Sequence, residues 1–193
     1  GMNDAYFLFF ALLAIYLFLR EKDLFSALAL GLAASSKWTV FWVVPILGVI
    51  FLSLRRKLKP SLIWFLFVPI VVYLISYIPF FTAGHTFNQF INLNGSPFGV
   101  TQQMWWYHTN LKATHAYQSL WWTWPFLIRP VWLYTSGVVG NVTANIYAMG
   151  NPIVFWFGLA SVAACVIFSA RASNRRLGII IFSYLAFFVP WAF

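Results

Sequence analysis

The sequence predicts an all-α integral membrane protein with about six transmembrane helices and one large outer loop. Three observations support this prediction. Hydrophobic residues make up 62% of the 193-residue chain and charged residues 8%, whereas soluble domains are usually about 45–50% apolar and about 25% charged. Apolar runs recur at lengths near the roughly 20 residues that a helix needs to cross a bilayer. The breaks between these runs hold most of the basic residues.

The expected spans are residues 5–19, 24–36, 39–54, 61–77, 152–169 and 177–193. Residues 24–54 are divided because Ser35, Ser36 and Lys37 would be costly in the middle of lipid. One helix over this stretch would be about 46 Å long, against a hydrocarbon core of roughly 30 Å. We therefore expect two short spans, tilted or partly re-entrant, with a turn near Lys37.

The charge pattern predicts which side each end faces. Lys and Arg number 12 and Asp and Glu 3, giving a net charge of +9. No readable basic fold accompanies this charge, so a nucleic-acid partner is not expected. Most basic residues fall in three clusters: Arg20 with Lys22, residues 55–59, and residues 171–176. Six spans place all three clusters on the cytoplasmic side, which leaves Asp4, Lys37 and the outer loop 78–151 on the outer face.

The outer loop is unusually aromatic. It holds Trp105, Trp106, Trp121, Trp122, Trp124 and Trp132. Trp and Tyr gather where lipid headgroups meet water, so an aromatic anchor is one interpretation. The density between Trp105 and Trp132 exceeds what anchoring requires, and ring faces beside cations also suit a sugar and a phosphate. Both interpretations stay open.

A helix over residues 103–114 would place His108, Lys112 and His115 on one face. The two histidines would lie about 10 Å apart along the axis, and no carboxylate is nearby, so no metal site is predicted. A cationic, hydrogen-bonding face suits a phosphate diester. The alternative is that the histidines simply lie at the boundary between lipid and water.

The three carboxylates are Asp4, Glu21 and Asp23. Glu21 and Asp23 belong to the predicted cytoplasmic turn, so Asp4 is the sole acid on the predicted outer face. As the first residue of a helix it would interact favourably with the helix dipole. As an acid at the mouth of the bundle it would be a mechanistic candidate. A reaction that needs two carboxylates cannot be assembled from this chain alone.

An ordered series of motifs runs through nearly the whole chain: Asn3-Asp4-Ala5, residues 31–39, residues 77–81, Gln103-Met104, Tyr107-His108, residues 111–115, Tyr117, Ser119, Trp124-Pro125, Arg129-Pro130 and residues 150–152. This series resembles the protein O-mannosyltransferase family. The chain departs from the family at His115-Ala116-Tyr117, where the family usually has His-Pro-Tyr, so the local turn is expected to differ.

The resemblance implies part of a larger type C glycosyltransferase bundle. Such enzymes transfer mannose, or a related sugar, from a polyprenyl- or dolichyl-phosphate donor to Ser or Thr hydroxyls of proteins on the outer face, with inversion. Asp4 matches the family's acid at the start of a later span, which implies a supporting catalytic role. The family's main acidic motif lies upstream, so the chain is expected to be a fragment that is inactive alone.

The candidate substrate-binding residues are Lys37, Tyr107, His108, Lys112, His115, Tyr117, Trp121, Trp124 and Arg129. A divalent cation stays open as a cofactor, and no other cofactor is indicated. The outer loop has no room for the β-trefoil domain of eukaryotic members. We therefore expect a multi-pass protein of a prokaryotic plasma membrane, with its active face outside.

Alternative functions stay open at this stage. A transferase of the same type could act on a lipid or glycan acceptor. A transporter would be expected to show charged or broken helices near mid-membrane and often an inverted repeat, neither of which the sequence shows. A non-catalytic scaffold would leave the Trp/His segment without a purpose.

Overall fold

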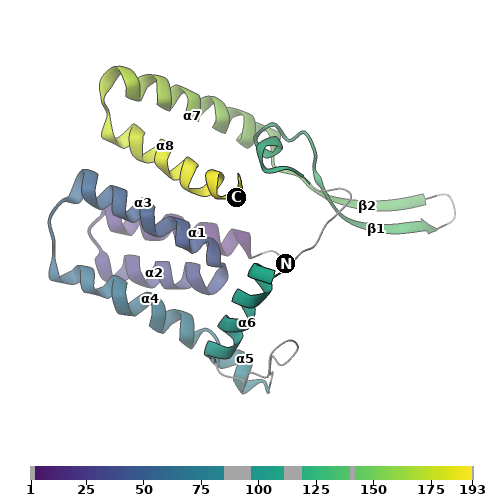
Figure 1. Ribbon diagram of the computed structural model, residues 1–193, viewed down its shortest axis with the longest axis horizontal. Coiled ribbons are helices and arrows are strands. Elements are labelled where there is room, and N and C mark those ends of the chain that lie inside the picture. Colours follow the sequence, from purple (N-terminus) through teal and green to yellow (C-terminus); the bar gives the residue numbers. More distant parts are fainter. Residues whose placement is uncertain (1–2, 85–96, 111–118, 140–141, 193) are drawn as a thin grey trace. The chain divides into compact units, whose positions relative to one another are not determined.

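The computed structural model describes residues 3–84, 97–110, 119–139 and 142–192, and they are mostly helical (Figure 1). The chain divides into two compact units, Gly1–Lys112 and Ala113–Phe193, and each is described by itself. The N-terminal unit contains α1 (Asp4–Leu19), α2 (Asp23–Ser36), α3 (Val43–Ile50), α4 (Trp64–Ile75), α5 (Ile78–Thr82) and α6 (Pro97–Asn110). The C-terminal unit contains β1 (Val131–Val139), β2 (Val142–Ala148), α7 (Pro152–Ala172) and α8 (Arg175–Phe188).

Within the described residues, four helical runs are long and apolar enough to cross a membrane: Trp38–Arg55, Pro60–Thr82, Pro152–Ala172 and Arg175–Ala192. The first run joins the short 3₁₀ turn η1 (Trp38–Trp42), α3 and the π-helical turn η2 (Phe51–Arg55). The helices α1 and α2 are apolar but have only 16 and 14 residues, about 24 and 21 Å at 1.5 Å per residue. The expected spans 5–19 and 24–36 are thus shorter than a hydrocarbon core, and a count of six spans stays a prediction.

The turn predicted near Lys37 is confirmed. Lys37 has extended backbone angles, φ −161° and ψ 138°, which end α2 before η1 begins. The hydroxyls of Ser35 and Ser36 donate to the carbonyls of Gly31 and Leu32 one turn earlier, at 2.9 Å each. The last turn of α2 therefore satisfies its polar side chains internally.

Small residues bring α2 against its neighbours α1 and α4, which lie beside it in Figure 1. Ala14 and Ala27 are fully buried, and the Ser26 hydroxyl donates to the Ala14 carbonyl across the α1–α2 contact at 2.7 Å. A Cβ added at Gly31 would lie 2.7 Å from Cβ of Val72 and 3.0 Å from Cα of Pro69. Glycine therefore allows α2 and α4 to approach each other closely.

A buried ion pair joins Asp23, the first residue of α2, to Arg55, the last residue of η2. Arg55 donates to both carboxylate oxygens of Asp23, at 2.6 and 3.2 Å, and the two side chains are 5% and 2% exposed. The Ser61 hydroxyl, from the turn before α4, also donates to Asp23. The Arg55 guanidinium lies 4.4 Å from the centre of the Phe18 ring of α1. One network therefore connects the ends of α1, α2, the run through α3, and α4.

An exposed ion pair lies beside this network. Lys59 donates to Glu21, and this hydrogen bond together with the charge of Lys59 lowers the pKa of the Glu21 carboxyl. Both contacts place the turn at residues 20–23 beside residues 55–61. The prediction that the first two basic clusters share one side is therefore supported by their common end of the bundle.

The C-terminal unit begins its two long helices with asparagine caps. The Asn151 side chain accepts from the backbone N–H groups of Ile153 and Val154, and Asn174 accepts from that of Arg176. Both caps satisfy N–H groups that a helix leaves unpaired at its start. The basic residues of the third cluster, Arg171, Arg175 and Arg176, flank the turn at Ser173 and Asn174 between α7 and α8.

The expectation of an all-α chain is wrong for residues 131–148. β1 and β2 form an antiparallel two-stranded sheet, with Trp132 opposite Tyr147 and Thr135 opposite Asn145. Both segments are rich in β-branched and aromatic residues, which favour strands. The described residues of the predicted outer loop contain regular structure: α5, α6, the 3₁₀ turn η4 (Trp121–Phe126) and this hairpin.

We predict that Arg55→Met lowers the free energy of unfolding by about 3–5 kcal/mol, because it leaves the buried Asp23 carboxylate without a cation. The double variant Asp23→Asn/Arg55→Met should recover most of this loss. Unfolding in detergent would measure both. Lys59→Met is the matched control at the exposed ion pair and should change stability little. Equal, small losses for Arg55→Met and Lys59→Met would contradict the account.

Candidate functional site

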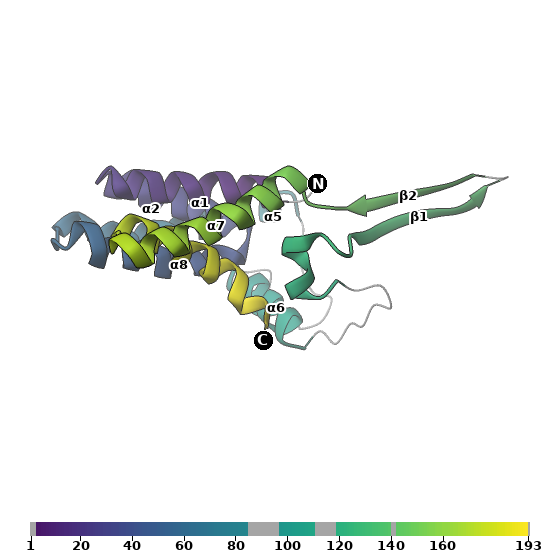
Figure 2. The same cartoon turned by 90° about the horizontal axis from the view of Figure 1, so that it is seen from above.

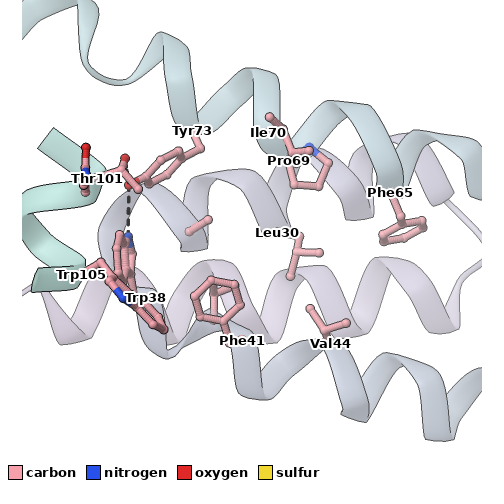
Figure 3. Close-up of a pocket in the computed structure, with 13 residues that line it drawn as sticks. Leu30, Trp38, Phe41, Val44, Phe65, Pro69, Ile70, Tyr73, Thr101 and Trp105 are labelled. Atoms are coloured by element: carbon pink, nitrogen blue, oxygen red, sulfur yellow. Dashed lines mark hydrogen bonds between the residues drawn. The ribbon is translucent and has the colours of Figure 1, made fainter. Parts of the chain in front are cut away.

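An apolar groove of about 600 Å³ lies in the N-terminal unit between α2, the run from η1 to α3, α4 and α6 (Figure 3). Its walls are almost entirely aliphatic and aromatic. The lining residues are Leu30, Ala34, Trp38, Val40, Phe41, Val44, Phe65, Pro69, Ile70, Tyr73, Thr101, Gln102 and Trp105. A groove with this lining can hold a hydrocarbon chain, because its walls offer contact area and very few polar groups.

The two ends of the groove differ in chemistry. Phe65 lies at one end in Figure 3, and Tyr73, Thr101 and Trp105 lie at the other. The groove follows α4 from Phe65 to Tyr73, about 12 Å at 1.5 Å per residue. Among the lining residues that Figure 3 labels, those with hydroxyl or indole groups all lie at the Tyr73 end. The groove is therefore amphipathic along its length.

The Tyr73 hydroxyl is the centre of a hydrogen-bonded cluster at this end. It accepts from Nε1 of Trp38 at 3.1 Å, and its oxygen lies 2.7 Å from the Tyr77 hydroxyl and 3.1 Å from that of Thr101. Tyr77 also donates to Sδ of Met104 at 3.6 Å. These contacts join η1, the end of α4 and α6, so they fix the mouth of the groove.

Lys37 and Asp4 form an ion pair at the same end of the bundle. Nζ of Lys37 lies 2.5 Å from Oδ1 of Asp4, and the side chains are 42% and 54% exposed. Lys37 directly precedes Trp38, which lines the groove. The sequence suggested both residues separately, and the structure brings them together. A half-exposed lysine beside the mouth of an apolar groove can reach an anionic group, and the partly exposed carboxylate holds its position.

Two more predicted residues lie on α6. The His108 ring centre is 6.2 Å from that of Trp38 and 5.6 Å from that of Tyr107. His108 is therefore near the mouth of the groove, on the surface of the unit. The predicted helix is confirmed as far as Asn110, the last described residue of α6. Lys112, His115 and Tyr117 lie outside the described residues, so the shared face with His108 stays a prediction.

The other three predicted residues belong to the C-terminal unit. The Trp121 ring packs edge-to-face on Phe188 at 5.2 Å, and the Trp124 ring on Trp191 at 5.3 Å. Nε1 of Trp124 donates to the Ser119 carbonyl at 3.3 Å. These contacts attach η4 to the end of α8, so both tryptophans have a structural role in this unit.

Arg129 lines a smaller pocket of about 220 Å³ in the same unit. Trp124, Gly150 and Phe155 also line it. A Cβ at Gly150 would lie 2.3 Å from the Phe155 ring, so glycine is needed there for that ring to pack. The pocket lining combines an arginine with aromatic residues, a set of residue types that suits a phosphate or a sugar.

No group of three or more His, Cys, Asp or Glu that could hold a metal gathers within the described part of the chain. The groove was not predicted from the sequence. Tyr73, Tyr77 and Thr101 at its polar end were not predicted as site residues either. A signal was present: two tyrosines one turn apart near the end of a predicted span. Tyrosines at such a position are equally typical of a membrane boundary, which explains the omission.

Comparison with known proteins supplies independent information. A family model described as the C-terminal four TMM region of protein-O-mannosyltransferase matches residues 96–193. A polyprenol-phosphate-mannose–protein mannosyltransferase of Mycolicibacterium smegmatis is 26% identical over 84% of this chain and 40% of its own length. A protein of the same description from Mycobacterium tuberculosis is 24% identical over 84% of this chain and 39% of its own length. The chain thus spans about 40% of the length of these relatives. No solved structure matches the chain.

We predict that Tyr73→Phe destabilises the N-terminal unit by about 1–3 kcal/mol, because the Trp38 N–H loses its acceptor in a partly buried cluster. Amide hydrogen exchange in α6 should accelerate, since α6 is connected to α4 through this hydroxyl. Tyr6→Phe, at an exposed position of α1, is the control and should leave both measurements unchanged. Unaltered hydrogen exchange in α6 after Tyr73→Phe would show that the Tyr73 cluster does not stabilise the packing of α6 on α4.

Proposed function

The chain belongs to the protein O-mannosyltransferase family, and on that premise we propose that it forms the donor-binding part of a membrane mannosyltransferase. The donor is a polyprenyl-phosphate-linked mannose, or a related sugar, and the acceptor is a Ser or Thr hydroxyl of a protein. The apolar groove that ends at the Tyr73 cluster and the Asp4–Lys37 ion pair carries this proposal.

The form of the groove supports a lipid phosphate as its occupant. A polyprenyl phosphate has a long hydrocarbon chain and one anionic end. The aliphatic and aromatic walls between Phe65 and Val44 suit the chain, since each CH₂ removed from water is worth about 0.8 kcal/mol. The mouth, with Trp38 and Tyr73, offers hydrogen-bonding groups where the anionic end would lie.

Lys37 and His108 are the proposed partners of the phosphate. The Lys37 ammonium lies beside the mouth, and the His108 ring lies 6.2 Å from Trp38 at the same end. Positive and hydrogen-bonding groups stabilise the charge that develops on the phosphate as the sugar departs. Tyr107 would contribute an aromatic plane for the sugar. Trp121, Trp124 and Arg129 of the C-terminal unit, and Lys112, His115 and Tyr117, are further proposed substrate-binding residues on the evidence of the sequence pattern.

The reaction itself is a displacement at the sugar carbon. The acceptor hydroxyl attacks that carbon as the bond to the phosphate oxygen breaks, and this single displacement inverts the configuration of the carbon. A carboxylate takes the proton of the hydroxyl. Asp4 is the proposed supporting acid. Because it accepts from Lys37, its first effect is to orient the ammonium toward the phosphate. We place this chemistry on the outer face of a prokaryotic plasma membrane.

A transfer assay on the full-length protein tests the proposed function. Purified protein in detergent or nanodiscs is given polyprenyl-phosphate-mannose with a radiolabelled sugar and a Ser/Thr-rich peptide. We expect the label to appear on the peptide. Transfer to a lipid or glycan but not to the peptide would change the acceptor. Absence of transfer to any acceptor, with the fold intact, would overturn the proposal.

Asp4→Asn should lower kcat at least about tenfold, equivalent to 1.4 kcal/mol, because the Lys37 ammonium loses its anionic partner. The exposed ion pair contributes little to stability, so the unfolding free energy should fall by less than about 1 kcal/mol. Glu21→Gln, which removes the acid of the exposed ion pair with Lys59 at the other end of the bundle, is the matched control and should keep full activity. Wild-type turnover by Asp4→Asn would remove Asp4 from the catalytic set.

A further inference from the structure

The hairpin of β1 and β2 has open edges that the proposed donor site does not use. Figures 1 and 2 show both strands projecting from the rest of the C-terminal unit. Natural proteins usually block exposed strand edges with charged residues or proline. Residues 131–148 include none of either. Within the described residues β1 and β2 pair only with each other, so the backbone groups on their outer edges can bind another extended chain.

The two edges are not equivalent. β1 carries two irregularities, between Trp132 and Tyr134 and between Thr135 and Val138. Gly137 in the second has φ +70°, a left-handed conformation that interrupts a regular edge. At both irregularities the additional residue lies in β1, so the backbone groups of β2 keep a regular alternation. The regular edge of the hairpin is therefore the outer edge of β2.

One hydrogen bond identifies the backbone groups on that edge. The Ala144 N–H donates to the Ser136 hydroxyl of β1 at 3.0 Å, so Ala144 directs its backbone groups toward β1. Successive residues of a strand direct these groups to opposite sides. Thr143, Asn145 and Tyr147 therefore direct theirs to the outer edge. Three alternate residues form a template for one added strand.

The chemistry of this edge specifies its occupant. Strand addition binds an extended peptide through main-chain hydrogen bonds, which depend little on the peptide's sequence. An enzyme that modifies Ser and Thr in different proteins needs this kind of recognition. The side chains on β2 add apolar and aromatic area without charge, since Ile146 is 55% exposed and Tyr147 53%.

We propose that the outer edge of β2 binds the acceptor polypeptide as an added antiparallel or parallel strand. This inference rests on the proposed function, because it assigns the acceptor of the same reaction. It gives the protein a way to hold an unfolded segment near the membrane, since β2 ends at Ala148 and α7 begins at Pro152.

Proline substitution on the edge tests this inference in the full-length protein. Asn145→Pro removes an outward N–H without removing a hydrogen bond to β1. Asn145→Ala keeps the N–H and removes the side chain that accepts from Nε1 of Trp132. We expect Asn145→Pro to raise the peptide KM at least about fivefold over Asn145→Ala. The donor KM and the turnover at saturating peptide should stay unchanged. Thr143→Pro and Thr143→Ala form a second pair.

A modified acceptor tests the same point with unaltered protein, so misfolding of a variant cannot confuse it. A peptide N-methylated on both flanks of its Thr cannot pair with a strand edge, and its KM should exceed that of the unmethylated peptide. Equal KM values for the two peptides, or equal effects of the Pro and Ala variants, would overturn the inference and leave the proposed function intact. If the wild-type protein transfers to no peptide, the proposed function fails and this inference with it.

Discussion

The buried ion pair between Asp23 and Arg55 determines how the helices of the N-terminal unit can pack. Two charges taken out of water are costly unless they meet with good geometry. Here the guanidinium contacts both carboxylate oxygens and Ser61 adds a third hydrogen bond. Such a pair tolerates few alternative arrangements, so the start of α2, the end of η2 and the turn before α4 must meet at one point.

The arrangement at the other end of the bundle depends on that meeting point. Once α2 and the run through α3 are joined at the Asp23–Arg55 pair, the break at Lys37 lies at their far ends, beside the start of α1. Lys37 can then reach Asp4, and Trp38 can reach Tyr73 on α4. Gly31 lets α2 touch α4 at Pro69 and Val72, next to the wall of the groove. A constraint at one end thus produces an apolar groove with a polar mouth at the other.

Local chemistry explains which features could be predicted from the sequence. The apolar runs and the polar break at Lys37 are determined by residues next to each other in the chain, and the structure has both. The bounds of α1 and α2 lie within one residue of the predicted spans 5–19 and 24–36, because charged or polar turns delimit both helices. The hairpin at residues 131–148 was not predicted, because its β-branched and aromatic residues are also typical of an apolar segment at a membrane boundary. Long-range features were not predictable: Leu30, Phe41 and Ile70 look like any lipid-facing residues until three helices bring them together. Asp4 and Lys37 were each predicted as site residues, yet their ion pair depends on the packing of α1 and α2.

Photochemical labelling tests most directly whether the groove binds the lipid chain of a polyprenyl phosphate. A polyprenyl phosphate with a photoreactive group in its chain is bound to the full-length protein, irradiated, and located by mass spectrometry of the digested protein. We expect labelling of groove residues such as Phe41 and Ile70, competition by unlabelled polyprenyl-phosphate-mannose, and loss of labelling in Ala34→Phe, which fills the groove. Leu32→Phe, at an exposed position of the same helix, should be labelled as the wild type is. Competed labelling that lies elsewhere and persists in Ala34→Phe would contradict the account.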